Sequence, residues 1–343
     1  MKVQPSKVRK LKNIAIRILV VVVAWYALSR QLLRHNDLAR VWDSFAEQAH
    51  TKTFWWLLVP VFLGMLLNWS LEAIKWRLLT MKSERISFLR ALQAVLTGIT
   101  VGTFTPNRVG EFIGRSFVLD RSHPWKALFM TMVGSFAQLL ITIMAGTAGF
   151  LIFVMEYGWF STGNLYMDLL IGFFALAAVA LLMIFYFHID LIDYYFGRWI
   201  GRKRPGFARW VHVLSEYSTP DLLKALMLSG ARYLVFSWQF IYLIHLLGLP
   251  VPYGEAMVFL TLSYLVMTLI PTIALSELGV RGTVTLLFFG YYFGPQGPDA
   301  AATVALVGAA SLLWVINLVI PALAGTLFVY RLKVFRNGNT ESA

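Results

Sequence analysis

Long apolar stretches dominate the chain, and short polar or basic segments separate each stretch from the next. A bilayer core about 30 Å thick takes roughly 20 apolar residues of helix, and backbone groups inside it must form their hydrogen bonds within the segment. The pattern therefore predicts an all-α, polytopic membrane protein. The six expected transmembrane helices are residues 13–30, 54–78, 125–153, 166–187, 222–247 and 301–329.

Two further apolar regions are interrupted by proline and by charged residues. Residues 88–119 are too long for one span and break at Thr105, Pro106 and Asn107, and residues 255–290 break at Pro271. Irregular backbone at membrane depth is tolerated where protein surrounds it. Each region is therefore predicted to be a re-entrant hairpin of two half-helices, with eight full spans as the alternative.

The basic residues indicate the orientation of the chain. Lys and Arg gather in cytoplasmic loops, and the hairpin assignment places every strongly basic segment on one side. We therefore expect a multi-pass protein of the inner (plasma) membrane with both termini in the cytoplasm. The basic segments are residues 2–17, 82–90, 198–209 and 331–336.

Composition agrees with a lipid environment and narrows the chemistry. Of the 343 residues, 58% are hydrophobic and 14% are charged, against roughly a quarter charged in soluble domains. The net charge of +13 would suggest nucleic acid in a soluble protein, but here it fits loops beside anionic lipid, so no nucleic-acid partner is expected. The chain has no cysteine, its six histidines lack metal-site spacing, and no P-loop motif is present. We expect neither a metal nor another cofactor.

The two interruptions share a pattern of residues. A proline is followed by a glutamate and an arginine four residues apart, Glu111 with Arg115 and Glu277 with Arg281. That spacing places both side chains on one face of a helix, where they can pair. An odd number of spans separates the copies, so the second is inverted, as in many secondary transporters. Within a single membrane domain, the repeats are predicted at residues 54–153 and 222–330.

Ionisable groups at membrane depth are costly and therefore mark candidate functional positions. Arginines beside the N-termini of half-helices favour phosphate, so we predict a substrate-binding site for an anionic head group. The alternative is that each glutamate and arginine only neutralise one another. The predicted site residues are Arg108, Glu111, Arg115, Arg232, Glu277 and Arg281.

Other polar positions have two interpretations each. Glu72 faces either a cavity or a packed interface, whereas Lys75 and Arg77 are expected to extend to the cytoplasmic surface. Gly98 and Gly102 have the four-residue spacing of closely packed helices. Close packing is the preferred interpretation there, with a polar pathway as the alternative.

The segment from Thr105 to Arg115 resembles the T-P-G-R-x-G-E signature, followed by arginine, of the lysylphosphatidylglycerol synthase transmembrane-region family. The segment that ends at Arg281 is similar to a later P-x-x-x-G-x-G-x-R-E segment of that family. The chain departs from the pattern at Asn107, where the family has glycine, and at Gly282, where it has an acidic residue. These departures leave the substrate open.

The resemblance implies a lipid-translocating domain, as in the flippase part of the multiple peptide resistance factor. That larger protein carries a soluble aminoacyl-transferase domain, and this chain stops at Ala343, so no synthase activity is expected. We predict a flippase-like or lipid-binding protein for an anionic phospholipid or lipid-linked amphiphile, held in a central cavity.

Two other classes of function stay open. One is a membrane-embedded enzyme acting on lipid head groups, with Glu111 or the group His188, Asp190 and Asp193 in catalysis. The other is a non-transporting scaffold for a partner. Homo-oligomerisation is also open.

Overall fold

The computed structural model describes residues 52–103, 105, 108–119, 123–158, 163–197, 205–270 and 274–329. Every regular element in these ranges is helical, as predicted. The predicted first span at 13–30, the basic segments at 2–17, 198–204 and 331–336, and residues Pro106, Asn107 and Pro271 lie outside the described residues.

Within the described residues, four helical stretches are long and apolar enough to cross a membrane. They are α3 (Lys52–Thr80), α6 (Pro124–Tyr157), α7 (Leu165–Phe187) and the continuous run Ala300–Phe328. Helix α11 (Thr219–Leu246) has 28 residues and is more polar. These helices coincide with the predicted elements, and the chain is a multi-pass membrane protein.

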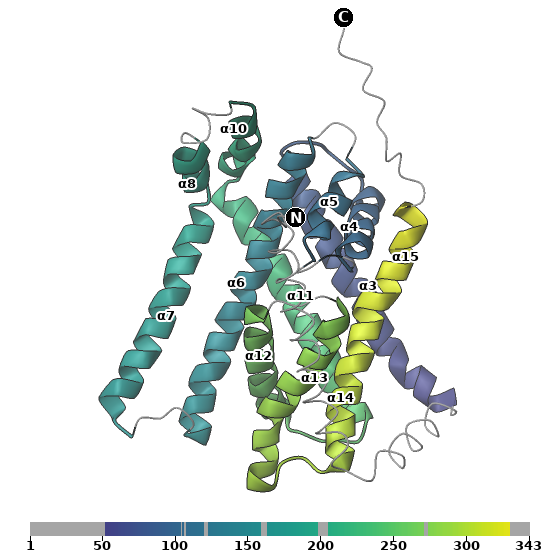
Figure 1. Cartoon of the computed structure of the whole chain (residues 1–343), viewed down its shortest axis with the longest axis vertical. Coiled ribbons are helices and arrows are strands. Elements are labelled where there is room, and N and C mark those ends of the chain that lie inside the picture. Colours follow the sequence, from purple (N-terminus) through teal and green to yellow (C-terminus); the bar gives the residue numbers. More distant parts are fainter. Residues whose placement is uncertain are drawn as a thin grey trace, which may run out of the picture.

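Both predicted interruptions are present. The first separates α4 (Phe88–Thr103) from α5 (Gly110–Ser116), and the second separates α12 (Tyr253–Leu269) from α13 (Ala274–Phe289). Figure 1 shows the α4–α5 pair in the upper half of the bundle and the α12–α13 pair in the lower half. Arg108, in the first break, has a left-handed φ of 55°, a conformation that costs a non-glycine residue about 1–2 kcal/mol.

Glycines bring α4 and α5 into close contact. A Cβ atom on Gly114 would lie 2.8 Å from the Cα of Gly98, and one on Gly102 would lie 2.6 Å from the Cγ of Glu111. The close packing predicted for Gly98 and Gly102 is confirmed. Because Gly98 has no side chain, the side chain of Arg115 can pass over it and reach Glu72.

Helices far apart in the sequence form the centre of the protein. Helix α3 packs along α11, α4 packs on α15 (Ile320–Val329), and α12 packs on α6. Thr100 donates a hydrogen bond to the Ala322 carbonyl across the α4–α15 contact, at 2.7 Å. Small residues also bring α6 against α12, where Gly149 faces Thr261.

The last long helix contains a π-helical turn. Helix α14 (Ala300–Trp314) continues through the π turn Val315–Val319 (η5) into α15. The Asn317 carbonyl in this turn accepts a hydrogen bond from Trp69 Nε1 at 3.2 Å. Short elements complete the described chain: α8 (Asp190–Ile192), η2 (Asp193–Gly197), α10 (Pro205–Val211), η3 (His212–Glu216) and η4 (Gly290–Gln296).

Candidate functional site

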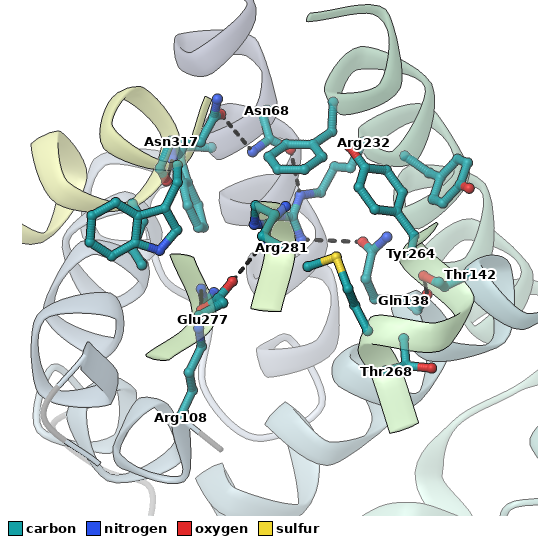
Figure 2. Close-up of a pocket in the computed structure, with 16 residues that line it drawn as sticks. Asn68, Arg108, Gln138, Thr142, Arg232, Tyr264, Thr268, Glu277, Arg281 and Asn317 are labelled. Atoms are coloured by element: carbon teal, nitrogen blue, oxygen red, sulfur yellow. Dashed lines mark hydrogen bonds and ion pairs between the residues drawn. The ribbon is translucent and has the colours of Figure 1, made fainter. Parts of the chain in front are cut away.

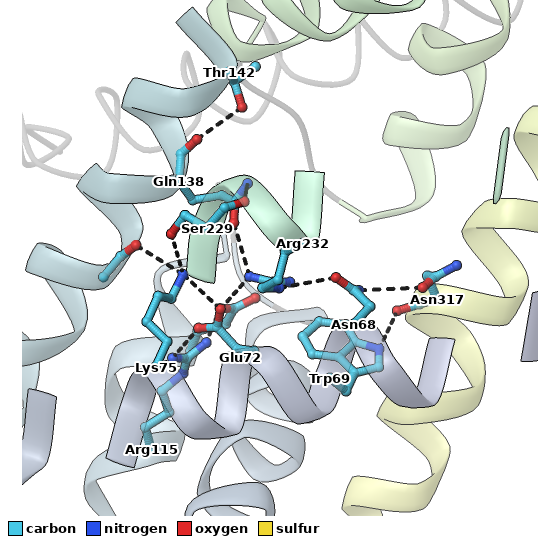
Figure 3. Close-up of polar contacts among 12 residues, drawn as sticks. Asn68, Trp69, Glu72, Lys75, Arg115, Gln138, Thr142, Ser229, Arg232 and Asn317 are labelled. Atoms are coloured by element: carbon cyan, nitrogen blue, oxygen red, sulfur yellow. Dashed lines mark hydrogen bonds and ion pairs between the residues drawn. The ribbon is translucent and has the colours of Figure 1, made fainter. Parts of the chain in front are cut away.

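Glu72 is the centre of a buried ion-pair cluster (Figure 3). Its Oε1 accepts from Arg115 Nη1 at 2.8 Å, and its Oε2 lies 2.8 Å from Lys75 Nζ and also pairs with Arg232 Nη1. Three cations from α3, α5 and α11 thus share one carboxylate. Arg115 keeps a second carboxylate, Glu111, at 3.2 Å.

Lys75 is fully enclosed, so the expectation that it extends to the cytoplasmic surface is wrong. Its side chain is 1% exposed, and its Nζ donates to the Gly134 carbonyl at 3.2 Å and to Ser229 Oγ at 3.1 Å. Lys75 points inward because of its position on the helix. Lys75 follows Glu72 by three residues and so shares its inward face, between α6 and α11.

Arg232 lies near the middle of α11, about 20 Å from either end at 1.5 Å per residue. Its Nε donates to Asn68 Oδ1 at 3.1 Å and its Nη1 to Gln138 Oε1 at 3.3 Å. The guanidinium lies 5.3 Å from the centre of the Trp69 ring, within cation–π range. Residues of α3 and α6 therefore fix the orientation of this arginine.

A second cluster connects the two interrupted regions. Glu277 Oε2 accepts from Arg108 Nη2 at 2.7 Å, and its Oε1 accepts from Arg281 Nη2 at 2.7 Å. The predicted pairs Glu277–Arg281 and Glu111–Arg115 are both confirmed. The link from Glu277 to Arg108 was not predicted, because these residues are 169 positions apart in the sequence and meet only in the folded chain.

A cavity of about 370 Å³ lies between these clusters (Figure 2). Its charged lining residues are Arg108, Arg232, Glu277 and Arg281, all of which are site residues predicted from the sequence. Arg115 and Glu111 are not among the lining residues; Arg115 instead pairs with both Glu72 and Glu111. The remaining lining is aromatic, amide, hydroxyl and apolar: Asn68, Trp69, Gln138, Thr142, Tyr233, Phe236, Tyr264, Met267, Thr268, Trp314, Asn317 and Leu318.

Several cavity residues were missed because their sequence signals are weak. Trp69, Tyr264 and Trp314 are three among many aromatic residues in apolar helices. Glu72 belongs to the ion-pair cluster and not to the cavity lining. It was detectable from the sequence, because an acidic residue inside an apolar span is costly unless it is paired. Only the fold, however, reveals that it contacts three cations.

The polar group at the end of α7 has separate local partners. His188 Nδ1 lies 2.9 Å from the Ile184 carbonyl, and Asp193 pairs with His212 at 2.8 Å. Within the described residues, no three His, Asp or Glu side chains are placed to hold a metal ion.

Bilayer-length helices around a charged central cavity define a multi-pass α-helical membrane protein. Residues 14–320 match the family described as lysylphosphatidylglycerol synthase TM region, and the chain belongs to this family. The suspected resemblance is thus confirmed, and the family is related to lipid handling. No curated protein and no solved structure matches the chain.

Proposed function

We propose that this protein binds an anionic phospholipid or lipid-linked amphiphile by its head group in the central cavity and moves it across the membrane. The observation that carries the proposal is the cavity lining, in which three arginines accompany one carboxylate. Charged groups in the interior of a membrane protein usually face a bundle interior or a substrate pathway. Guanidinium groups match phosphate oxygens in a bidentate geometry, so a phosphate-containing head group suits this lining.

The interrupted regions would form an inverted repeat around this cavity, with residues 54–153 and 222–330 as its halves. The packing supports this part of the proposal. If α3–α6 corresponds to α11–α15, then the contact of α4 with α15 corresponds to that of α12 with α6. The contact of α3 with α11 would lie at the centre of the pseudo-symmetry. Inverted repeats with broken helices allow one half to rock against the other around a fixed site.

Glu277 would couple binding to movement. It ties Arg108, beside α5, to Arg281 on α13, and so connects the two interrupted regions. A bound phosphate would compete with the carboxylate for both arginines and loosen this connection. Arg115 and Glu111 would act indirectly, by holding α5 against Glu72.

The topology belongs to the same proposal. Re-entrant hairpins, cytoplasmic termini and a location in the inner membrane would bring the basic loops beside anionic lipid. The interrupted helices and the cavity would then lie near the middle of the bilayer.

A translocation assay tests the proposed function. The full chain is reconstituted into liposomes that contain a fluorescent phosphatidate or, in a separate preparation, a fluorescent phosphatidylglycerol, and a membrane-impermeant quencher reports the movement of the lipid between leaflets. Arg281→Gln is expected to lower the rate at least tenfold, because the head group loses one of its cationic partners. Glu277 retains Arg108 in this variant, so the fold is expected to persist, and thermal unfolding checks that it does.

Arg77→Gln is the matched control, because Arg77 is exposed in the last turn of α3 and does not line the cavity. Its rate should equal that of the wild type. Equal rates in Arg281→Gln and Arg77→Gln, or no translocation of either lipid by the wild type above that of empty liposomes, would refute the proposal. Turnover of the lipid head group during the assay would favour the enzyme alternative.

A further inference from the structure

The ion-pair clusters beside the cavity are not balanced in charge. Among the described residues, the Glu72 cluster contains three cations and two carboxylates, and the Glu277 cluster contains two cations and one carboxylate. Each cluster therefore has one positive charge in excess, two in total. Uncompensated charge in a low-dielectric interior is unfavourable, so the pair of clusters favours a ligand that brings two negative charges.

The arginines of the cavity wall have hydrogen-bond donors that Glu277 does not use. Both carboxylate oxygens of Glu277 already accept from arginines. Arg281 Nε, Trp314 Nε1 and the Tyr264 hydroxyl are among the buried polar atoms without a hydrogen-bond partner in the described residues. Because a guanidinium has five N–H donors and no acceptor, Arg108 and Arg281 offer further donors beyond those used by Glu277. The wall is thus suited to a ligand rich in acceptor oxygens.

The cavity is poorly suited to a cationic or zwitterionic head group. Ammonium groups are commonly bound over aromatic faces. Here arginines already approach two such rings, with Arg232 5.3 Å from the Trp69 ring centre and Arg281 5.7 Å from that of Phe236. An added ammonium would meet these guanidinium groups and the excess positive charge.

We infer that the head group bound in this cavity is a phosphomonoester carrying close to two negative charges, rather than a singly charged phosphodiester. This inference rests on the proposed function and specifies its substrate class. Arg108 and Arg281 contact the two oxygens of a single carboxylate, so one compact anion can reach both. A phosphomonoester supplies three terminal oxygens and about −1.5 to −2 charge near pH 7, which matches the donor set and the excess charge.

Equilibrium binding to the full chain in detergent micelles tests this inference. The probes are lysophosphatidate, lysophosphatidylglycerol and lysophosphatidylcholine with one common acyl chain, so that only the head group differs. Lysophosphatidate is expected to bind at least tenfold more tightly than lysophosphatidylglycerol, and lysophosphatidylcholine more weakly than both. Inorganic phosphate is added as a competitor to separate a lipid head group from free phosphate.

Arg281→Gln removes one of the two excess charges, so the preference for lysophosphatidate should fall to threefold or less. Arg77→Gln, outside the cavity, should retain the full preference. Equal or tighter binding of lysophosphatidylglycerol by the wild type would overturn the phosphomonoester assignment while leaving the proposed function intact. Competition by inorganic phosphate as strong as that by lysophosphatidate would overturn the lipid assignment. If no lysolipid binds, the proposed function fails as well.

Discussion

Replacing Glu72 with glutamine is expected to lower the free energy of unfolding by about 3 kcal/mol. The substitution preserves the shape of the side chain and removes the charge that Lys75, Arg115 and Arg232 share. Removing one partner of a buried ion pair typically costs about 3–5 kcal/mol, because the remaining charge stays buried without compensation.

The lower end of that range follows from the partners that remain. Arg115 keeps Glu111 at 3.2 Å, and Arg232 keeps Asn68 Oδ1 at 3.1 Å. Lys75 keeps the Gly134 carbonyl and Ser229, which are both neutral. One cation retains a carboxylate and the other two retain neutral hydrogen-bond acceptors, so the loss is partly offset.

Unfolding in mixed micelles, followed by tryptophan fluorescence, measures this loss. Glu216→Gln is the control, because its pair with Lys126 at 3.3 Å is partly exposed and should contribute less than about 1 kcal/mol. Adding Lys75→Met to Glu72→Gln removes one uncompensated cation and should recover part of the stability. A loss no larger than that of the control, or a double variant less stable than Glu72→Gln alone, would contradict the reasoning.

Three further substitutions are measured by the same unfolding assay. Gly114→Ala should cost about 1–3 kcal/mol, because its Cβ would lie 2.8 Å from backbone atoms of α4, whereas Gly254→Ala has open space and should cost nothing. Trp69→Phe should cost about 1–3 kcal/mol, because it leaves the buried Asn317 carbonyl without its indole donor. An unchanged unfolding midpoint would show that this hydrogen bond contributes no net stability. Tyr217→Phe removes a 2.8 Å hydrogen bond to a carbonyl in the last turn of α3 and should cost about 1 kcal/mol, with no loss as the contrary result.

The positions of the described helices and of their interruptions could be predicted from the sequence, because the bilayer imposes strong length and polarity constraints. The breaks near Thr105 and Pro271 are visible as polar and proline residues inside otherwise apolar regions. The pairing of Glu111 with Arg115 and of Glu277 with Arg281 follows from helical periodicity alone, and both pairs are present.

Contacts between helices could not be predicted in the same way. The inward position of Lys75 depends on α6 and α11 being its neighbours, which a pattern within α3 does not contain. The pair between Arg108 and Glu277 depends likewise on the meeting of two distant breaks. The prediction for Lys75 also failed because of side-chain length, since a lysine that is long enough to reach the surface can equally reach a buried carboxylate.

The π turn at Val315–Val319 sets the rotational phase between the two halves of the last long helix. Trp314, immediately before the turn, lines the cavity, whereas Ala322, after the turn, accepts a hydrogen bond from Thr100 on α4 through its carbonyl. One residue in an α-helix corresponds to about 100° of rotation and 1.5 Å of rise. Deleting a single residue in the π turn would rotate α15 relative to α14 by about this angle. The extra residue of the turn therefore sets which side of α14 faces the cavity and which side of α15 faces α4.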